Sequence, residues 1–244
     1  MIVTEILGSG ASYGEAIKNM LNNFKILFTA YSNISYVERY AVDVSNNIYR
    51  DIYEVTGFDK YYIAFQDGAD YNTDIVFQIY EKADYHTNNP IYEMVWKGDG
   101  GLSANDTPYV KYKFYAFSSN NVLRGFTLIG YSQDVSCQMI VFATSTESGN
   151  HYICSYNSAI VNSDTPTSYS YDSRLVEFNE AEKALKQNLV ITNGNNNYVD
   201  IIYGLDLFIN SQFENMTFSL IQVGNKKYRQ VFENFMFIEN GDDE

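Results

Sequence analysis

The sequence predicts a mainly β protein, with an antiparallel β-sandwich or barrel-like core and an amphipathic helix near the N-terminus. The first observation is composition: 23 Tyr and 16 Phe in 244 residues, because aromatic side chains favour a pleated, half-buried surface. The second is the recurrence of short β-forming runs with turn-forming clusters between them, which is typical of sandwiches and barrels. The third is that only 3 Pro and no linker interrupt the chain, which favours one domain over residues 1–244.

The helix is predicted over about residues 12–30. Ser12 is a good N-cap residue, and Glu15 three positions later completes a capping box. Apolar residues then follow at helical spacing, at Ile17, Met20, Leu21, Phe24, Leu27 and Phe28. This stripe predicts a helix that packs on the edge or face of the protein's own sheet. The alternative is a helix that docks into a neighbouring subunit.

The β region is predicted over about residues 33–238. Its first strand is expected to place one set of apolar residues on a single face, interrupted by Glu38: Ile34, Tyr36, Tyr40, Val42 and Val44. Further strands are predicted at Ile48–Val55, Tyr61–Gln66, Asp74–Tyr80, Ile91–Trp96, Tyr109–Phe117, Leu123–Tyr131, Cys137–Thr144 and His151–Tyr156. The turn clusters between them include Gln66–Asp70, Asn88–Pro90, Gly98–Gly101, Ser118–Asn121 and Glu147–Asn150.

The last third of the chain is predicted to begin with a polar loop over Asn162–Asp172. One short later helix is considered over Asn179–Gln187, where Ala181, Ala184 and Leu185 share a side. Strands are then expected at Leu189–Thr192, Tyr198–Tyr203, Leu205–Ile209, Thr217–Val223 and Tyr228–Ile238. A hairpin turn is predicted over Asn193–Asn197, and the acidic tail over 240–244 is expected to fray.

The charge of the chain disfavours nucleic acid and membrane surfaces as partners. Thirty acidic residues against 16 basic ones give a formal net charge of −14, and the densest basic stretch is Lys226, Lys227 and Arg229. Nucleic-acid binding draws much of its affinity from basic contacts with phosphate, and anionic membranes attract basic segments. No run approaches the roughly 18 apolar residues of a membrane span, and we expect no ordinary signal peptide. The prediction is therefore no direct nucleic-acid binding and no membrane partner.

Three glycines before the first helix resemble a phosphate-binding loop only superficially. Gly8, Gly10 and Gly14 do not have the spacing of the dinucleotide fingerprint, and no βαβ pattern follows them. We expect them to ease the entry into the capped helix.

Four residues match ligand positions of a calcium-binding loop: Asp70, Asn72, Asp74 and Glu81. However, Ile75 stands where that loop needs a glycine for its sharp turn. A solvated acidic turn is therefore favoured, and a cation held by Asp67 and Asp70 is the alternative.

No catalytic, cofactor-binding or metal-ligating residue is predicted. His86 and His151 are far apart in the sequence, neither has a recognisable nucleophile partner, and no Cys/His cluster has zinc-ligand spacing. Trp96, the single tryptophan, is interpreted as a core or interface anchor at a strand end, and stacking on a sugar is the alternative. Cys137 and Cys154 fall on neighbouring predicted strands, and two buried free thiols are favoured over a cross-strand disulfide.

Three segments occur in a recognisable order in the first two thirds of the chain. A helix with a phenylalanine-rich end, Ala16–Phe28, is followed by the strand Tyr61–Phe65 and then by the strand pair Met139–Thr144 and His151–Tyr156. This order resembles a class of virion structural proteins of tailed bacteriophages. The resemblance implies a particle component of the tail, baseplate or neck, with no catalytic residues to carry over.

The expected function is a non-enzymatic structural subunit of a bacteriophage particle, assembled in the host cytoplasm and located in the virion. Its expected partners are copies of itself and other virion proteins, since Tyr-rich surfaces suit protein contacts. The alternative is a carbohydrate- or receptor-binding adhesin module. Trp96 and the Tyr-rich segment Ser168–Asp172 are its motive, because aromatic rings could stack on a host-surface glycan. An enzyme that acts on polysaccharide is a third hypothesis, without residues to name.

Overall fold

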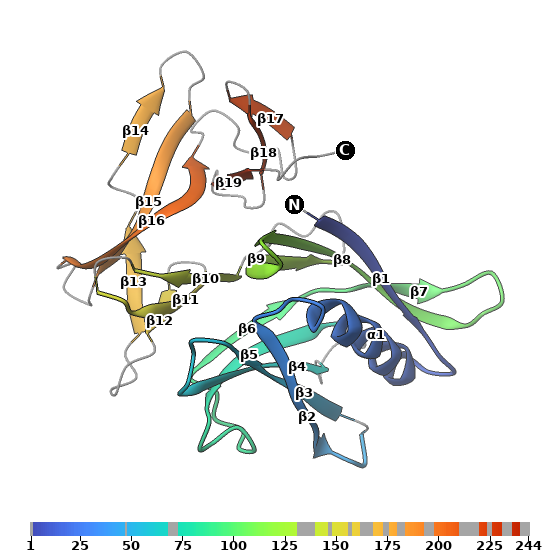
Figure 1. Cartoon of the computed structure of the whole chain (residues 1–244). Helices are drawn as coiled ribbons and strands as arrows, with labels where there is room; N and C mark the ends of the chain where they lie inside the picture. Colours follow the sequence, from blue (N-terminus) through green and yellow to red (C-terminus); the bar gives the residue numbers. More distant parts are fainter. Residues whose placement is uncertain are drawn as a thin grey trace.

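The computed structural model describes residues 2–46, 48–67, 73–130, 140–145, 148–155, 158–161, 168–172, 176–179, 184–192, 198–209, 220–223, 226–230 and 236–239. From residue 154 onward it describes the backbone and the side chain of Asp200. Within these residues the protein is mainly β, with one helix and two antiparallel sheets (Figure 1). The prediction of a mainly β, sandwich-like fold is confirmed at this level.

The larger sheet has 14 strands within the described ranges. They are β1 (Ile2–Ser9), β7 (Asp99–Leu102), β8 (Pro108–Ser119), β9 (Val122–Ile129), β10 (Ile140–Thr144), β11 (His151–Ser155), β12 (Ser158–Val161), β13 (Ser168–Asp172), β14 (Val176–Asn179), β15 (Ala184–Thr192), β16 (Tyr198–Ile209), β17 (Leu220–Val223), β18 (Lys226–Gln230) and β19 (Met236–Glu239). The strand order is β1-β8-β9-β10-β11-β12-β13-β15-β16-β19-β18-β17, with β7 beside β8 and β14 beside β15. In this order β1 is an edge strand.

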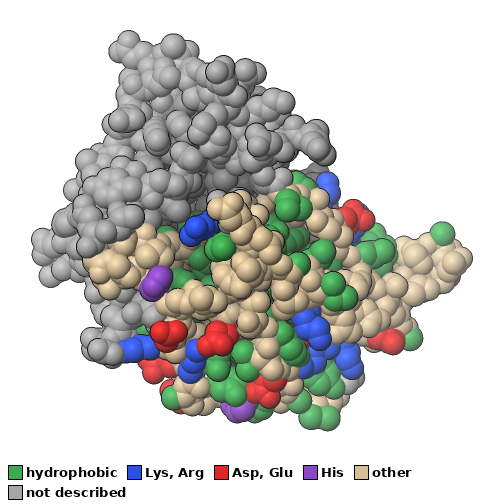
Figure 2. All heavy atoms as spheres, in the orientation of Figure 1, with side chains coloured by type: hydrophobic (Ala, Val, Ile, Leu, Met, Phe, Trp, Pro, Cys, Tyr) green, Lys and Arg blue, Asp and Glu red, His purple; other side chains and the backbone are tan. Residues whose placement is uncertain are grey.

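The smaller sheet is a five-stranded meander. Its strands, in spatial as well as chain order, are β2 (Ile34–Asp43), β3 (Ile48–Val55), β4 (Tyr61–Asp67), β5 (Ile75–Glu81) and β6 (Tyr92–Trp96). On the face seen in Figure 2, acidic, basic and hydrophobic side chains intermingle over this part of the molecule.

The helix α1 (Tyr13–Phe28) lies within the predicted range. Ser12 caps it as expected, because its Oγ accepts a hydrogen bond from the Glu15 amide at 3.2 Å. The Glu15 carboxylate accepts from the backbone amide of Ala11 at 2.8 Å, one residue earlier than a capping box requires. The apolar stripe is buried, at Ala16, Ile17, Met20, Leu21, Phe24 and Phe28.

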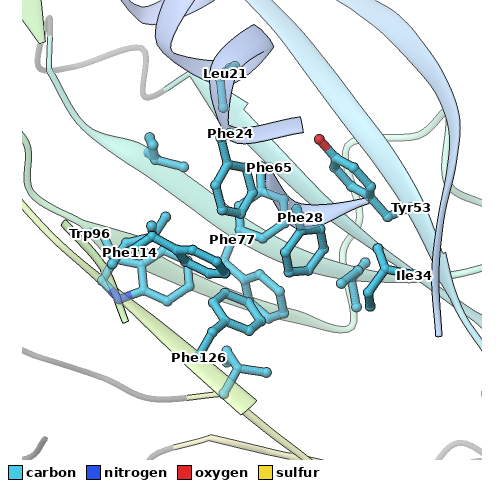
Figure 3. Close-up of a cluster of buried hydrophobic side chains, with 14 of the residues drawn as sticks. Leu21, Phe24, Phe28, Ile34, Tyr53, Phe65, Phe77, Trp96, Phe114 and Phe126 are labelled. Atoms are coloured by element: carbon cyan, nitrogen blue, oxygen red, sulfur yellow. The ribbon is translucent and has the colours of Figure 1, made fainter. Parts of the chain in front are cut away.

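One aromatic core joins the helix to both sheets (Figure 3). The Phe24 ring lies 4.7 Å from Phe65 on β4 and 5.4 Å from Phe114 on β8. The sheets also meet directly, since Phe126 on β9 lies 6.2 Å from Phe77 on β5. Each aromatic pair adds about 0.5–1.5 kcal/mol beyond its buried area. The interpretation of the helix as packed on the protein's own sheet is therefore confirmed.

The first predicted strand does not keep one face. In β2 the register against β3 shifts between Tyr36 and Glu38, so Val37 is an extra residue in a β-bulge. One extra residue turns the side chains that follow to the other face, here as far as the second register shift, between Ala41 and Asp43. Tyr36 accordingly packs in the central core, whereas Tyr40 packs on the outer face of the sheet. The prediction of a single face is wrong for this reason.

The later helix predicted over Asn179–Gln187 is wrong. Asn179 ends β14 and Ala184 begins β15, and these two residues are antiparallel partners. A helix of fewer than about 12 residues is marginal by itself. Pairing with β14 and β16 supplies the backbone hydrogen bonds instead, with Leu185 opposite Ile209.

Other predicted boundaries also change. The single strand predicted over Tyr228–Ile238 is wrong, because this range contains parts of two strands, β18 and β19, that pair with each other. Ser168–Asp172 is strand β13 rather than part of a loop, and Asp99–Leu102 is strand β7 rather than a turn. The two strands predicted in residues 198–209 form one strand, β16. The hairpin turn predicted over Asn193–Asn197 and the acidic tail lie outside the described residues.

Candidate functional site

The edge strand β1 lies against α1 at an unusually short distance. A Cβ atom at Gly8 would lie 2.0 Å from the carbonyl oxygen of Ala16 and 2.3 Å from the amide of Met20. Only glycine fits this close approach of two backbones. Gly8 is therefore a packing residue of β1, which differs from the expected role of easing the helix entry.

Two asparagines of α1 bind the outer edge of β1. The side-chain amide of Asn23 donates to the carbonyl of Leu7 at 2.7 Å, and that of Asn19 donates to the carbonyl of Ser9 at 2.8 Å. These carbonyls therefore point away from β8. Alternate residues of a strand share one direction, and β1 pairs with β8 without a register shift. The backbone groups of Val3 and Glu5 consequently point outward as well.

Within the part of the chain that the structure describes, the stretch from Ile2 to Ile6 is thus an open sheet edge. No other strand of the described residues pairs with it. Three apolar side chains along β1 are exposed, at 52% for Ile2, 47% for Val3 and 47% for Leu7, and the exposed Glu5 lies between them. The strand contains no Lys and no Pro, the residues with which proteins commonly block such an edge. This arrangement can accept a further strand by main-chain pairing.

The buried cation Arg50 holds a loop over the outer face of the smaller sheet. Its guanidinium donates to the carbonyls of Tyr85 and Thr87 at 2.8 and 2.9 Å, and to the Gln66 side chain at 2.9 Å. Burial lowers the pKa of Arg50 from its ordinary value. The cation also lies 4.4 Å from the centre of the Tyr80 ring. These contacts assign Arg50 a structural role that the sequence did not indicate.

The buried carboxylate of Asp200 joins β16 to the β10–β11 hairpin. It accepts hydrogen bonds from the hydroxyls of Ser145 at 2.6 Å and Tyr152 at 2.7 Å, and from the hydroxyl of Ser148. Three hydroxyl donors stabilise a charged form that burial alone would disfavour. The cluster fastens the last third of the chain to the earlier strands.

The calcium-loop pattern does not form a calcium loop. Asp74 lies just before β5 and Glu81 ends it, so the seven-residue strand separates the two carboxylates. Asp67 ends β4, and burial raises its pKa to about 6. Asp70 and Asn72 lie outside the described residues. Within the described ranges, no three His, Cys, Asp or Glu side chains group closely enough to hold a metal ion.

The remaining candidates are placed as follows. Trp96 is 2% exposed and packs on Phe77, so its interpretation as a core anchor is confirmed and stacking on a solvent-borne sugar is excluded. His86 lies on the surface with its Nε2 2.6 Å from a Glu38 oxygen, whereas the Nδ1 of His151 lies 2.8 Å from the Thr144 hydroxyl. Cys137 and the side chain of Cys154 lie outside the described residues. Two free thiols, in preference to a disulfide, therefore stay a prediction.

Among the described residues, no helix has the length and apolar character of a membrane span. Comparison of the chain with models of protein families, with curated proteins and with solved structures finds no match.

Proposed function

We propose that this chain is a non-enzymatic structural subunit of a bacteriophage particle, in the tail, baseplate or neck. It acts by assembling with copies of itself and with other virion proteins, and it is assembled in the host cytoplasm before it becomes part of the virion.

The observation that carries the proposal is the open edge of β1. Main-chain groups at Val3 and Glu5 point outward beside exposed apolar side chains. Such an edge is a template for pairing with another chain, and a protein that stays monomeric normally blocks it. Repeated contacts of one kind close into rings when the rotation permits, which suits a tail or neck component. The order of segments that resembles phage virion proteins is the second support.

The test is quantitative peptide mass spectrometry of particles purified from the phage that encodes the chain. The proposal predicts several copies per particle, at a fixed ratio to a tail protein of known copy number. Absence of the chain from particles that are complete and infectious would overturn it.

The adhesin alternative loses Trp96 as a stacking surface, since that side chain is in the core. The side chains of Ser168–Asp172 lie outside the described residues. A ligand site for this alternative must therefore lie elsewhere in the fold.

A further inference from the structure

A cleft of about 260 Å³ opens where the two sheets approach each other. Its walls come from the turn between α1 and β2, from the end of β3 and the turn after it, from the start of β9, and from β10 and the first residue of β11. Sites for drug-sized ligands usually span about 300–1,000 Å³. This cleft therefore has the size for a molecule with one ring.

Hydrogen bonds fix one wall of the cleft before any ligand arrives. The Asn33 side chain donates to the carbonyl of Leu123 at 3.0 Å and accepts from the Leu123 amide at 2.8 Å. Beside it, the amide and hydroxyl of Ser32 both donate to the carbonyl of Asn121, at 2.9 and 3.0 Å. Two elements about ninety residues apart are thus joined, and a preorganised wall lowers the cost of binding.

The charge of the lining is opposite to that of the chain. Among the described lining residues Arg124 supplies a positive charge, His151 supplies an imidazole, and no Asp or Glu is present, although the whole chain carries −14. Arg124 is exposed, and its guanidinium has no ion pair or hydrogen bond with another described residue. A guanidinium fork matches a carboxylate in a bidentate pair.

The position of the His151 ring in the cleft is fixed by its neighbours. Its Nδ1 lies 2.8 Å from the Thr144 hydroxyl, and its ring packs against Phe58 with centroids 5.7 Å apart. A Cβ atom at Gly57 would lie 3.1 Å from the ring, so glycine leaves the space that the imidazole needs. With Nδ1 engaged by Thr144, Nε2 is the ring nitrogen left for a ligand.

We infer that this cleft binds a small hydroxylated carboxylate, of the size of one acidic sugar residue. Arg124 pairs with the carboxylate, and His151 donates from Nε2 when Thr144 donates to Nδ1. Thr56 and Ser32 supply polar groups for hydroxyls of the ligand, the Ser32 oxygen as an acceptor because its proton goes to the Asn121 carbonyl, and Phe58 supplies apolar lining for the ring. The inference is independent of the proposed function, because none of these residues belongs to β1.

The test is titration of the full chain with D-glucuronate, with N-acetylneuraminate, with D-glucose and with inorganic phosphate, followed by protein NMR. The inference predicts saturable shifts of cleft residues with the two acidic sugars and none with glucose. In Arg124→Gln the Kd for glucuronate should rise at least about tenfold, which corresponds to about 1.4 kcal/mol, because a charge-assisted hydrogen bond is lost. Thr56→Phe should abolish the shifts by filling the cleft.

The matched control is Lys113→Gln, which removes one exposed positive charge from β8 outside the cleft lining. Its Kd should equal that of the wild type, and all variants should keep the wild-type melting temperature. An equal response to glucose and glucuronate, tighter binding of phosphate than of glucuronate, or no saturable shift at all would each overturn the inference. An equal loss of binding in Lys113→Gln would also overturn it, because the effect would then come from net charge.

Discussion

At the scale of single residues, two buried tyrosines show opposite uses of the hydroxyl. Tyr53 and Tyr112 are both fully buried. The Tyr112 hydroxyl lies 2.8 Å from the carbonyl of Thr73 and 2.9 Å from that of Trp96, whereas the Tyr53 hydroxyl has no hydrogen-bond partner among the described residues. Burial is the largest cause that raises the pKa of each well above its ordinary value.

We predict that Tyr53→Phe leaves the free energy of unfolding unchanged or raises it by up to about 1 kcal/mol, because an unsatisfied buried hydroxyl is removed. Tyr112→Phe should lower it by about 1–2 kcal/mol, because the two carbonyls lose the single hydroxyl donor that they share. Urea denaturation measures both variants. An equal loss in the two would contradict the difference between the hydroxyls.

Asp67 predicts a pH dependence of stability. Burial raises its pKa to about 6, above the value of the unfolded chain, so the folded state holds the proton more tightly. Its contribution to stability is fully present below about pH 4 and is lost as the pH rises through about 6. Asp67→Asn should therefore gain melting temperature over the wild type between pH 4 and pH 7. A difference that stays constant over this range would argue against burial of the charge.

Two glycines before and within α1 provide a matched pair. Gly8→Ala should cost about 3 kcal/mol or more, at the upper end of overpacking costs, because the new methyl meets helix backbone. At Gly14 the nearest atom to a new Cβ is 4.0 Å away, so Gly14→Ala should gain roughly 0.5 kcal/mol as a better helix former. Thermal unfolding distinguishes them, and similar effects at both sites would show that β1 does not contact α1 as described.

At the scale of elements, α1 offers the sharpest test of the core. Phe24→Ala should lower the free energy of unfolding by about 3–5 kcal/mol, through lost burial and a cavity between the sheets. Asn22→Ala, off the buried stripe, should cost roughly 0.5 kcal/mol or less. An unchanged unfolding midpoint in Phe24→Ala would mean that the helix serves a partner and not the protein's own core.

The same helix was predictable from the sequence because its signals are local: a capping residue and apolar residues at a period that no strand shares. The bulge in β2 was not predictable from the sequence, although the charged Glu38 interrupts the apolar pattern of the strand at that point. On the outer face Glu38 contacts His86, 48 residues later, and the short sequence pattern holds no trace of that partner. In residues 184–187, helix-forming side chains were overridden by pairing with β14 and β16.

At the scale of the whole molecule, the sites depend on contacts between distant segments. The apolar start of the chain was visible, but the openness of its edge depends on β8 and on Asn19 and Asn23 of the helix. Likewise, Arg124 and His151 become neighbours of one cleft only when the sheets pack. Composition and the alternation of β-forming runs with turn clusters therefore predicted the fold class, and the arrangement of strands decided which surfaces are available.

The measurement that tests the central claim most directly is the number of copies per purified particle of the wild-type chain and of two variants at Glu5. Glu5→Pro removes an outward-pointing amide and leaves the β8 pairing intact, and Glu5→Ala is its matched control. We predict that Glu5→Ala is incorporated like the wild type, and that folded Glu5→Pro is absent from particles or reduced at least tenfold. Wild-type incorporation of Glu5→Pro would contradict assembly through the β1 edge.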